Sequence, residues 1–246
     1  MGEVISVISG KGGTGKTTIC AAIATCLAAE GKSVLCIDAD IGLRNLDISL
    51  GMADQPIIAF TDVMHGHYQL TDATEHPDLL KLSLFTAPIR ESDEQISVAE
   101  FGEFLKKVRE KFDYCLIDSP AGIGAGFRLT TAHADRFLVV STPDPASMRD
   151  AERTAELLLI EGKEDVRLIV NRITPKLFHR MDLTVDDIMD EVGLPLIGIV
   201  PEDSDVVLSA ASGEALIFAS SDGAAEACLR ISRRLRGIPT PLMKLK

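Results

Sequence analysis

A glycine-rich decapeptide near the N-terminus limits what this chain can fold into. Residues 9–18 read S-G-K-G-G-T-G-K-T-T, and residues 10–17 fit the phosphate-binding loop pattern G-x-x-x-x-G-K-[ST]. An apolar, β-branched run over residues 4–8 precedes the loop and predicts a strand buried on both faces. A run rich in Ala, Leu and Ile over residues 19–30 follows and stops at Gly31, which predicts a helix. The motif therefore lies in the strand–loop–helix context that phosphate binding requires.

The residues of this loop suit a polyphosphate. Glycines let backbone N–H groups wrap an anion without Cβ clashes, and the following helix directs the positive end of its dipole at the same anion. Lys16 is predicted to contact the β- and γ-phosphates, and the Thr17 hydroxyl to bind Mg²⁺. The predicted loop contacts are Gly10, Gly12, Gly13, Thr14, Gly15, Lys16, Thr17 and Thr18. A general phosphate loop has no use for Lys11, which on this pattern alone is expected to be a solvated loop lysine. A glycine-rich turn that binds nothing leaves the Lys-Thr pair unexplained, and the dinucleotide pattern G-x-G-x-x-G has no use for that pair.

Length, charge and cysteine usage narrow the class of protein. The 246 residues suffice for one substantial α/β domain, and the net charge of -12 argues against non-specific DNA binding as the main task. No apolar run approaches the length of a membrane span, and the N-terminus reads as a strand rather than a signal peptide. None of the five cysteines forms a C-x-x-C pair, so we expect buried, reduced thiols. These features predict a cytoplasmic protein.

Strand-like runs alternate with helical runs along the chain. After residues 4–8, strands are expected at 33–37, 82–85, 114–117, 136–140, 166–170 and 196–200, and helices at 98–111, 126–133, 146–160, 184–191, 205–211 and 222–236. The alternation predicts a three-layer α/β fold of the P-loop NTPase kind, in which helices flank both faces of a mainly parallel, twisted sheet. We expect a single domain over residues 1–237, with a short tail over 238–246. Residues 54–94 are the least regular part and are expected to form long surface loops.

Carboxylates follow two of the predicted strands, and ligands of parallel sheets bind at the carboxyl ends of strands. Asp38 and Asp40 follow the second strand, and Asp118 ends the apolar run Tyr-Cys-Leu-Ile. A single Asp at a strand end is usually turn chemistry or a helix cap. Three of them beside Lys16 and Thr17 favour a Mg²⁺ site, because Mg²⁺ prefers oxygen ligands and keeps several waters. Asp40 is also a candidate for orienting an attacking water.

Several motifs, taken in order, resemble the MinD/ParA class of ATPases and, within it, the MinD family. K-G-G-T-G-K-T-T at 11–18 resembles the deviant Walker A loop of the class. D-A-D-I-G-L-R-N-L-D at 38–47 and I-D-S-P-A-G-I at 117–123 are similar to the two switch segments of the MinD family. T-P-D-P-A-S-M-R-D-A at 142–151 resembles the family's stretch after the fifth strand. N-R at 171–172 and I-V-P-E-D at 199–203 resemble its adenine-side segments.

The resemblance implies a role for each matching residue. Lys11 would reach the nucleotide of the partner subunit in an ATP-bound dimer, and Asp40 would position the hydrolytic water. Lys11, Lys16 and Asp40 would thus be the catalytic residues. Mg²⁺ would be held by Thr17, Asp38 and Asp118. The adenine side would be formed by Asn171, Arg172, Pro201, Glu202 and Asp203.

The resemblance also implies a function, namely an ATP- and Mg²⁺-dependent ATPase that is slow without an activator and dimerises on binding ATP. The dimer would bind the membrane and a MinC-like division inhibitor, and so place the division site. A partitioning relative of the ParA type remains an alternative, although the acidic balance counts against DNA as a partner. A flagellar-placement relative usually carries an N-terminal extension, which is absent here. A nucleotide-sensing scaffold with little hydrolysis is the alternative from a different class, and the intact Asp40 counts against it.

The C-terminus departs from the family pattern of a basic amphipathic membrane helix. The last predicted helix places Ala224, Cys228, Ile231 and Leu235 on one stripe, as in a helix packed on the body. Only residues 241–246, P-L-M-K-L-K, follow the helix-stopping Gly and Pro. We therefore expect membrane contact at the inner face of the cell membrane to be weak or supplied by an adaptor protein.

Overall fold

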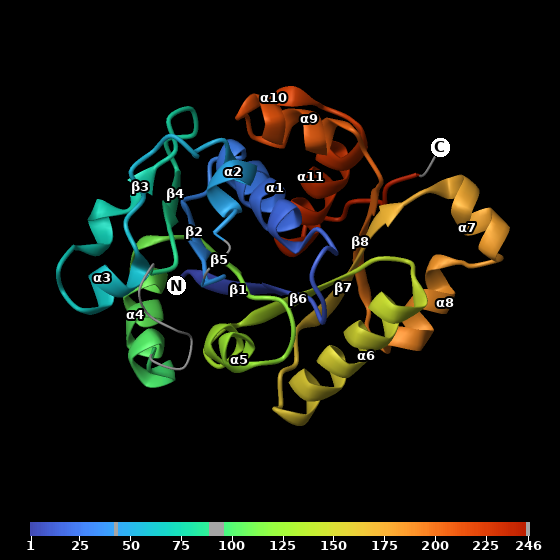
Figure 1. Cartoon of the computed structure of the whole chain (residues 1–246), viewed down its shortest axis with the longest axis horizontal. Coiled ribbons are helices and arrows are strands. Elements are labelled where there is room, and N and C mark those ends of the chain that lie inside the picture. Colours follow the sequence, from blue (N-terminus) through green and yellow to red (C-terminus); the bar gives the residue numbers. More distant parts are fainter. Residues whose placement is uncertain (42–43, 89–95, 245–246) are drawn as a thin grey trace.

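Eight strands form one twisted sheet at the centre of the molecule (Figure 1). The computed structural model describes residues 1–41, 44–88 and 96–244. The sheet order is β3-β4-β2-β5-β1-β6-β7-β8, and every pairing is parallel except that of β3 with β4. The strands are β1 (Glu3–Ile8), β2 (Val34–Asp38), β3 (Thr74–Glu75), β4 (Leu82–Phe85), β5 (Tyr114–Asp118), β6 (Arg136–Ser141), β7 (Val166–Ile173) and β8 (Leu196–Pro201).

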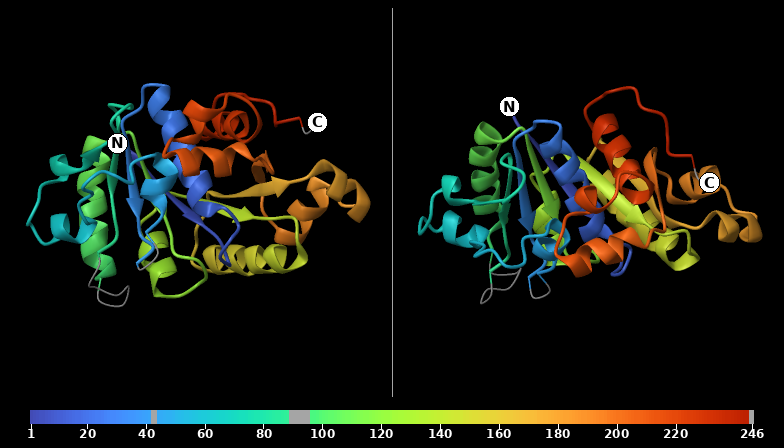
Figure 2. Two further views of the ribbon diagram at one scale, coloured as in Figure 1. Left: turned by 45° about the horizontal axis from the view of Figure 1, so that its top comes forward. Right: turned by 90° about the horizontal axis from the view of Figure 1, so that it is seen from above.

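Helices cover both faces of this sheet, which confirms the predicted three-layer α/β architecture (Figure 2). They are α1 (Lys16–Ala29), α2 (Leu46–Leu50), α3 (Phe60–Met64), α4 (Val98–Lys111), α5 (Ala125–Thr131), α6 (Pro145–Ile160), α7 (Pro175–Met181), α8 (Val185–Val192), α9 (Asp205–Ser212), α10 (Leu216–Ala219) and α11 (Gly223–Leu235), with a 3-10 turn at Leu70–Asp72. Among the helices of the described residues, none is long and apolar enough to cross a membrane.

The first strand shows why its residues are apolar throughout. Ile5 and Val7 face the core shared with α1 and α11, whereas Val4 faces the core under α4 and Ile8 the core under α6 and α8. All four side chains are completely buried. Because successive side chains of a strand point to opposite faces, a strand covered on both sides needs apolar residues at every position.

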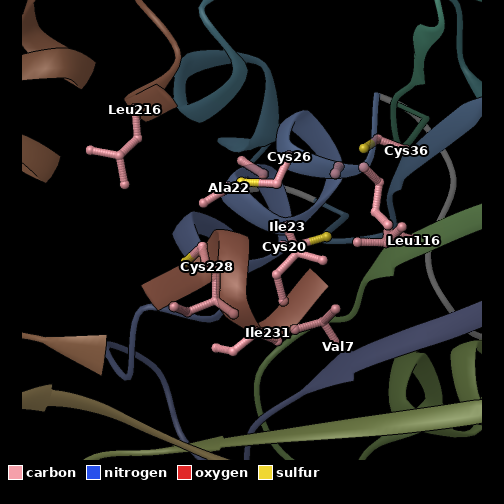
Figure 3. Packing of buried hydrophobic residues seen from close by; sticks show 14 of the residues in the cluster. Val7, Cys20, Ala22, Ile23, Cys26, Cys36, Leu116, Leu216, Cys228 and Ile231 are labelled. Carbon is pink, nitrogen blue, oxygen red and sulfur yellow. The ribbon is translucent and has the colours of Figure 1, made fainter. Parts of the chain in front are cut away.

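The last helix packs on the body as its apolar stripe predicts. Cys228 and Ile231 of α11 lie against α1, on the side of Ile23 and Cys26, whereas the Cys20 sulfur points toward Leu116 (Figure 3). The five cysteines are buried, as expected, and none is bonded to another. Burial raises the pKa of the Cys26 thiol to about 12. Arg233 and Arg236 bond to Glu30, so ion pairs also join the C-terminal ends of α1 and α11.

The prediction of long surface loops over residues 54–94 is wrong in part. The described residues of this stretch contain α3, the 3-10 turn and β3 as well as the expected strand β4. Residues 89–95 lie outside the described part of the chain. Three further helices were not predicted, namely α2, α7 and α10, each of seven residues or fewer. Helices this short show too few periods of apolar residues to be recognised from a sequence.

The tail after α11 lies against the body in the part described. Met243 packs on the cores of both sheet faces, which places it at the β8 edge. Arg230 donates to the carbonyl of Pro241, and Arg234 to that of Thr240. The last two residues, Leu245 and Lys246, which belong to the predicted membrane-contacting tail, are outside the described residues.

Candidate nucleotide-binding site

The glycine-rich loop joins β1 to α1 at the carboxyl edge of the sheet. Gly15 forms the N-cap of α1 at φ 85°, so Lys16 and Thr17 lie in the first helical turn rather than before it. A Cβ on Gly10 would lie 2.4 Å from the backbone oxygen of Asp150, and a Cβ on Gly15 would lie 2.3 Å from the amide nitrogen of Asn171. The neighbouring backbone and side-chain atoms therefore leave no room for a Cβ at either position, so both must be glycine.

Lys16 and Asp118 form a buried ion pair at the foot of this loop. The Lys16 Nζ lies 2.5 Å from Asp118 Oδ1, and both side chains are almost wholly buried. Burial raises the pKa of the Asp118 carboxyl, while the charge and hydrogen bond of Lys16 and a hydrogen bond from Thr17 oppose that rise. A phosphate that took the lysine away would leave a buried carboxylate in need of a cation, which is the situation that Mg²⁺ satisfies.

Asp38 lies beside Asp118, because β2 and β5 pair with these two residues in register. One oxygen of Asp38 accepts from the backbone N–H of Asp40 at 3.0 Å, and the other accepts from those of Asn45 and Leu46 at 3.1 Å each. Burial and the neighbouring Asp118 raise the pKa of Asp38 to about 6, and the three N–H groups oppose this rise. The sheet thus brings Asp38 and Asp118 together, and Thr17 of α1 joins them through its hydrogen bond to Asp118. Asp38 also anchors the segment that carries Asp40.

We predict that Asp38 makes the nucleotide-free protein less stable as pH rises from about 4 to about 6. A carboxyl whose pKa is raised on folding favours the folded state while protonated, and this contribution is lost as the pH passes through the folded pKa. The loss amounts to roughly 3 kcal/mol at most for a rise of this size. Urea unfolding across this pH range should show a smaller decline for Asp38→Asn than for the unaltered chain. Parallel curves for the two proteins would contradict the prediction.

Two of the predicted adenine-side residues, Asn171 and Arg172, contact the loop directly. The Asn171 amide nitrogen donates to the Thr14 carbonyl at 2.8 Å, so its amide oxygen is left as an acceptor. Asn171 and Arg172 were expected to follow a strand, but they lie within β7, next to a register shift. Arg172 has φ 59°, a strained backbone for a non-glycine residue, and its side chain reaches the Gly13 carbonyl and Glu202.

Asp203, predicted to lie on the adenine side, accepts hydrogen bonds from the starts of two helices. One oxygen of its carboxylate accepts from the N–H of Asp205 at 2.9 Å, and the other from the N–H of Ala224 at 2.8 Å. Asp203 thereby joins the starts of α9 and α11, directly after Pro201 ends β8. Its carboxylate holds these two helix starts in place, because both oxygens are bound to backbone N–H groups.

Lys11 lies in an ion pair that the sequence did not reveal. Its Nζ is 3.1 Å from Asp144 Oδ1, with both side chains partly exposed. Asp144 is the N-cap of α6, where its carboxylate also accepts from the Ser147 N–H and the Thr142 hydroxyl. The Asp-Pro pair at 144–145 is a recognisable helix start, but nothing in it indicates a lysine 133 residues away in sequence.

The residues at the loop fit a nucleotide phosphate and Mg²⁺. Among the buried side-chain polar atoms of the described residues, the Thr14 hydroxyl oxygen is the one without a hydrogen-bond partner. Cβ atoms on Gly12 and Gly13 would meet no atom within 4 Å, so this side of the loop is open to a ligand. The two carboxylates and the Thr17 hydroxyl are oxygen donors only, which suits Mg²⁺ rather than a transition metal.

Comparison with known proteins decides among the families that share this fold. The family model described as "CobQ/CobB/MinD/ParA nucleotide binding domain" matches residues 5–217. A septum site-determining protein MinD from Synechocystis sp. is 37% identical over 99% of this chain and 92% of its own length. The MinD of Bacillus subtilis is 36% identical over 100% and 93%. The chain belongs to the MinD family. Its function is that of a MinD-type division-site ATPase with a P-loop nucleotide-binding domain.

Solved structures of MinD proteins agree with this membership. MinD in the MinC:MinD cell division protein complex of Aquifex aeolicus superimposes with a TM-score of 0.91 at 37% identity, covering 98% of both chains. MinD of Pyrococcus horikoshii, solved with Mg-ADP, gives 0.82 at 25% identity and covers 96% of both chains. The predictions of the fold and of the family are therefore confirmed.

Proposed function

We propose that this chain is a Mg²⁺-dependent ATPase that works as a dimerisation switch, slow without an activator. The observation that best supports this proposal is the buried ion pair of Lys16 and Asp118 beside Asp38. A bound phosphate would pair with Lys16 instead, and the two carboxylates would then be free to bind a metal ion. Thr17, Asp38 and Asp118 would hold Mg²⁺, which neutralises phosphate charge when bound. Lys16 and the loop N–H groups bind the β- and γ-phosphates, and Asp40 orients the water that attacks the γ-phosphate.

Lys11 is proposed to act across the dimer, on the nucleotide of the partner subunit. In the single chain, Asp144 holds it at 3.1 Å. Both groups are partly exposed, so this pair is worth about 0–1 kcal/mol and is readily exchanged for a more strongly charged phosphate. Dimerisation would thus replace a weak contact within the chain by a stronger one between chains.

Gel filtration with light scattering tests the switch. We expect monomers in Mg-ADP and dimers with a non-hydrolysable Mg-ATP analogue. In ATP itself, Asp40→Ala should leave the dimer persisting, because without the oriented water the nucleotide is not cleaved. Monomers in every nucleotide would refute the dimerisation switch. If the unaltered chain forms dimers but hydrolyses no ATP even with an activator, then the alternative of a nucleotide-sensing scaffold is favoured.

We further propose a MinC-like division inhibitor and an ATPase activator as partners. The similarity to the MinD of the Aquifex MinC:MinD complex supports the first of these. The chain is proposed to be cytoplasmic and to contact the inner face of the membrane weakly or through an adaptor. The net charge of -12 does not support DNA as a partner.

The tail is expected to bind membranes weakly, and only as part of the ATP-bound dimer. Met243 is already partly buried against the cores of both sheet faces, so moving it into a membrane would contribute less than the about 1.5–3 kcal/mol of burying a fully exposed side chain. Two tails on one dimer gain through effective concentration. Sedimentation with anionic vesicles should therefore show salt-sensitive binding in ATP, little in ADP, and none for a chain ending at Gly237. Equal binding by the shortened chain would exclude the tail as the membrane contact.

A further inference from the structure

Helix α2 is a single short helix that is fastened at both ends. At its N-terminal end, the N–H groups of Asn45 and Leu46 donate to Asp38 Oδ2. At its C-terminal end, the Leu50 carbonyl is 2.8 Å from Nε2 of His76. Figure 1 shows α2 beside α1, on the side of the sheet edge formed by β3 and β4. A helix of five residues is not stable alone, so its position depends on these fastenings.

His76 is itself held in one orientation. The side chain is 2% exposed, and Nδ1 accepts from the N–H groups of Asp78 and Leu79 at 3.0 and 3.2 Å. A nitrogen that accepts two hydrogen bonds carries no proton, so the proton of the neutral ring is on Nε2, which donates to Leu50. The ring also lies against Phe218 of α10, with centroids 6.1 Å apart. The β3–β4 turn thus supplies a fixed donor to the end of α2.

Gly51, which follows α2, packs closely against the α9–α10 connection and prevents the helix from moving toward it. Gly51 ends the helix at φ 73°, and a Cβ there would lie 2.9 Å from both Ala215 N and Gly213 O in the α9–α10 connection. Leu46 and Leu50 are completely buried in the core with α1. If the hydrogen bond from His76 is lost, α2 can shift only away from the α9–α10 connection. Such a shift would change the positions of its first N–H groups relative to Asp38.

We propose that His76 is a positioning residue of the nucleotide site and acts through α2. By holding the Leu50 carbonyl, it keeps the N–H groups of Asn45 and Leu46 on the Asp38 carboxylate. The sheet places Asp38 beside Asp118, and these N–H groups keep the Asp38 carboxylate in the orientation from which it anchors Asp40 and serves the metal side of the site. The effect on Mg²⁺ rests on the function proposed above, whereas the effect on α2 itself does not.

Two conservative variants separate the two sides of the imidazole. In His76→Gln the amide nitrogen can reach the position of Nε2 and donate to Leu50, whereas in His76→Asn the amide oxygen takes the place of Nδ1 and nothing reaches Leu50. A role in stability alone predicts similar defects in both variants. Positioning through α2 predicts a defect in His76→Asn that His76→Gln largely rescues.

Amide hydrogen exchange by NMR on the nucleotide-free protein is the first measurement. We expect the Asn45 and Leu46 amides to exchange about tenfold faster in His76→Asn than in His76→Gln, since a lost anchor frees the first turn. The second measurement is the Mg²⁺ concentration for half-maximal binding of a fluorescent ADP analogue. It should rise about fivefold in His76→Asn, while affinity for the analogue without Mg²⁺ stays unchanged.

The outcomes distinguish this proposal from the function on which it partly rests. Equal exchange at Asn45 and Leu46 in both variants and the unaltered chain would overturn the role of His76. Equally faster exchange in both variants would reduce His76 to a stabilising residue and would also overturn the proposal. If the exchange contrast holds but the unaltered chain binds no Mg-nucleotide, then the anchoring of α2 stands and the proposed ATPase function fails.

Discussion

Lys16→Ala is expected to weaken binding of ATP and ADP by at least about a hundredfold, since a buried charge-assisted contact to the phosphates is lost. The same change should destabilise the nucleotide-free protein by about 3–5 kcal/mol, because it leaves the Asp118 carboxylate buried without its cation. Asp118 already has a raised pKa, so the defect should shrink as the pH is lowered and the carboxyl is protonated. Isothermal titration calorimetry and urea unfolding at several pH values measure the two effects.

A double variant separates binding from stability. Lys16→Met combined with Asp118→Asn removes both buried charges and keeps their approximate volumes, so stability should return close to that of the unaltered chain. Nucleotide binding should remain lost, because neither side chain can contact a phosphate as a cation. Near-normal ATP affinity in either variant would sink the assignment of the phosphate loop.

Lys11→Ala is expected to abolish the ATP-dependent dimer while leaving nucleotide binding by the single chain almost intact. Truncating one partner of a buried charge pair at an interface costs about 2–5 kcal/mol, and a symmetric dimer loses two such contacts. The partly exposed pair with Asp144 contributes at most about 1 kcal/mol, so the folded monomer should hardly change. Light scattering with a non-hydrolysable ATP analogue and thermal unfolding of the monomer provide the measurements.

Asp144→Asn is the matched control for this lysine. Asparagine caps a helix as well as aspartate does, so α6 keeps its start while the charge that holds Lys11 is removed. The variant should dimerise with ATP at least as readily as the unaltered chain. Should Lys11→Ala still dimerise, the lysine would be no more than a loop residue, and its pairing with Asp144 would be an ordinary surface contact.

The parts of the site that the sequence predicted are those carried by local pattern. The loop, the first helix turn with Lys16 and Thr17, and the strand ends at Asp38 and Asp118 follow from motif spacing and from where parallel strands end. The parts it missed depend on approach in space. Neither the contact of Lys11 with Asp144 nor the two N–H groups bound by Asp203 leaves a trace in residue order.

The same distinction explains the errors in the fold. Asn171 and Arg172 were placed after their strand, because the apolar run stops at Val170, yet pairing with β8 continues through a register shift to Ile173. A strand can continue through polar residues such as Asn171 and Arg172 where their side chains contact the phosphate loop, and its end is then not marked by the end of the apolar run. Helix α2 is likewise specified by its anchors at Asp38 and His76 rather than by its own five residues.

The packing of α1 against α11 has a consequence for synthesis of the chain. Helix α1 is apolar on nearly all sides and buries most of its residues, yet α11 begins about 200 residues later. At about 5–20 residues per second, the ribosome leaves the helix that carries the phosphate loop without its cover for roughly 10–40 s. The segment that will bind nucleotide therefore stays without its helical cover until the end of synthesis, and a ribosome stalled before α11 prolongs that exposure.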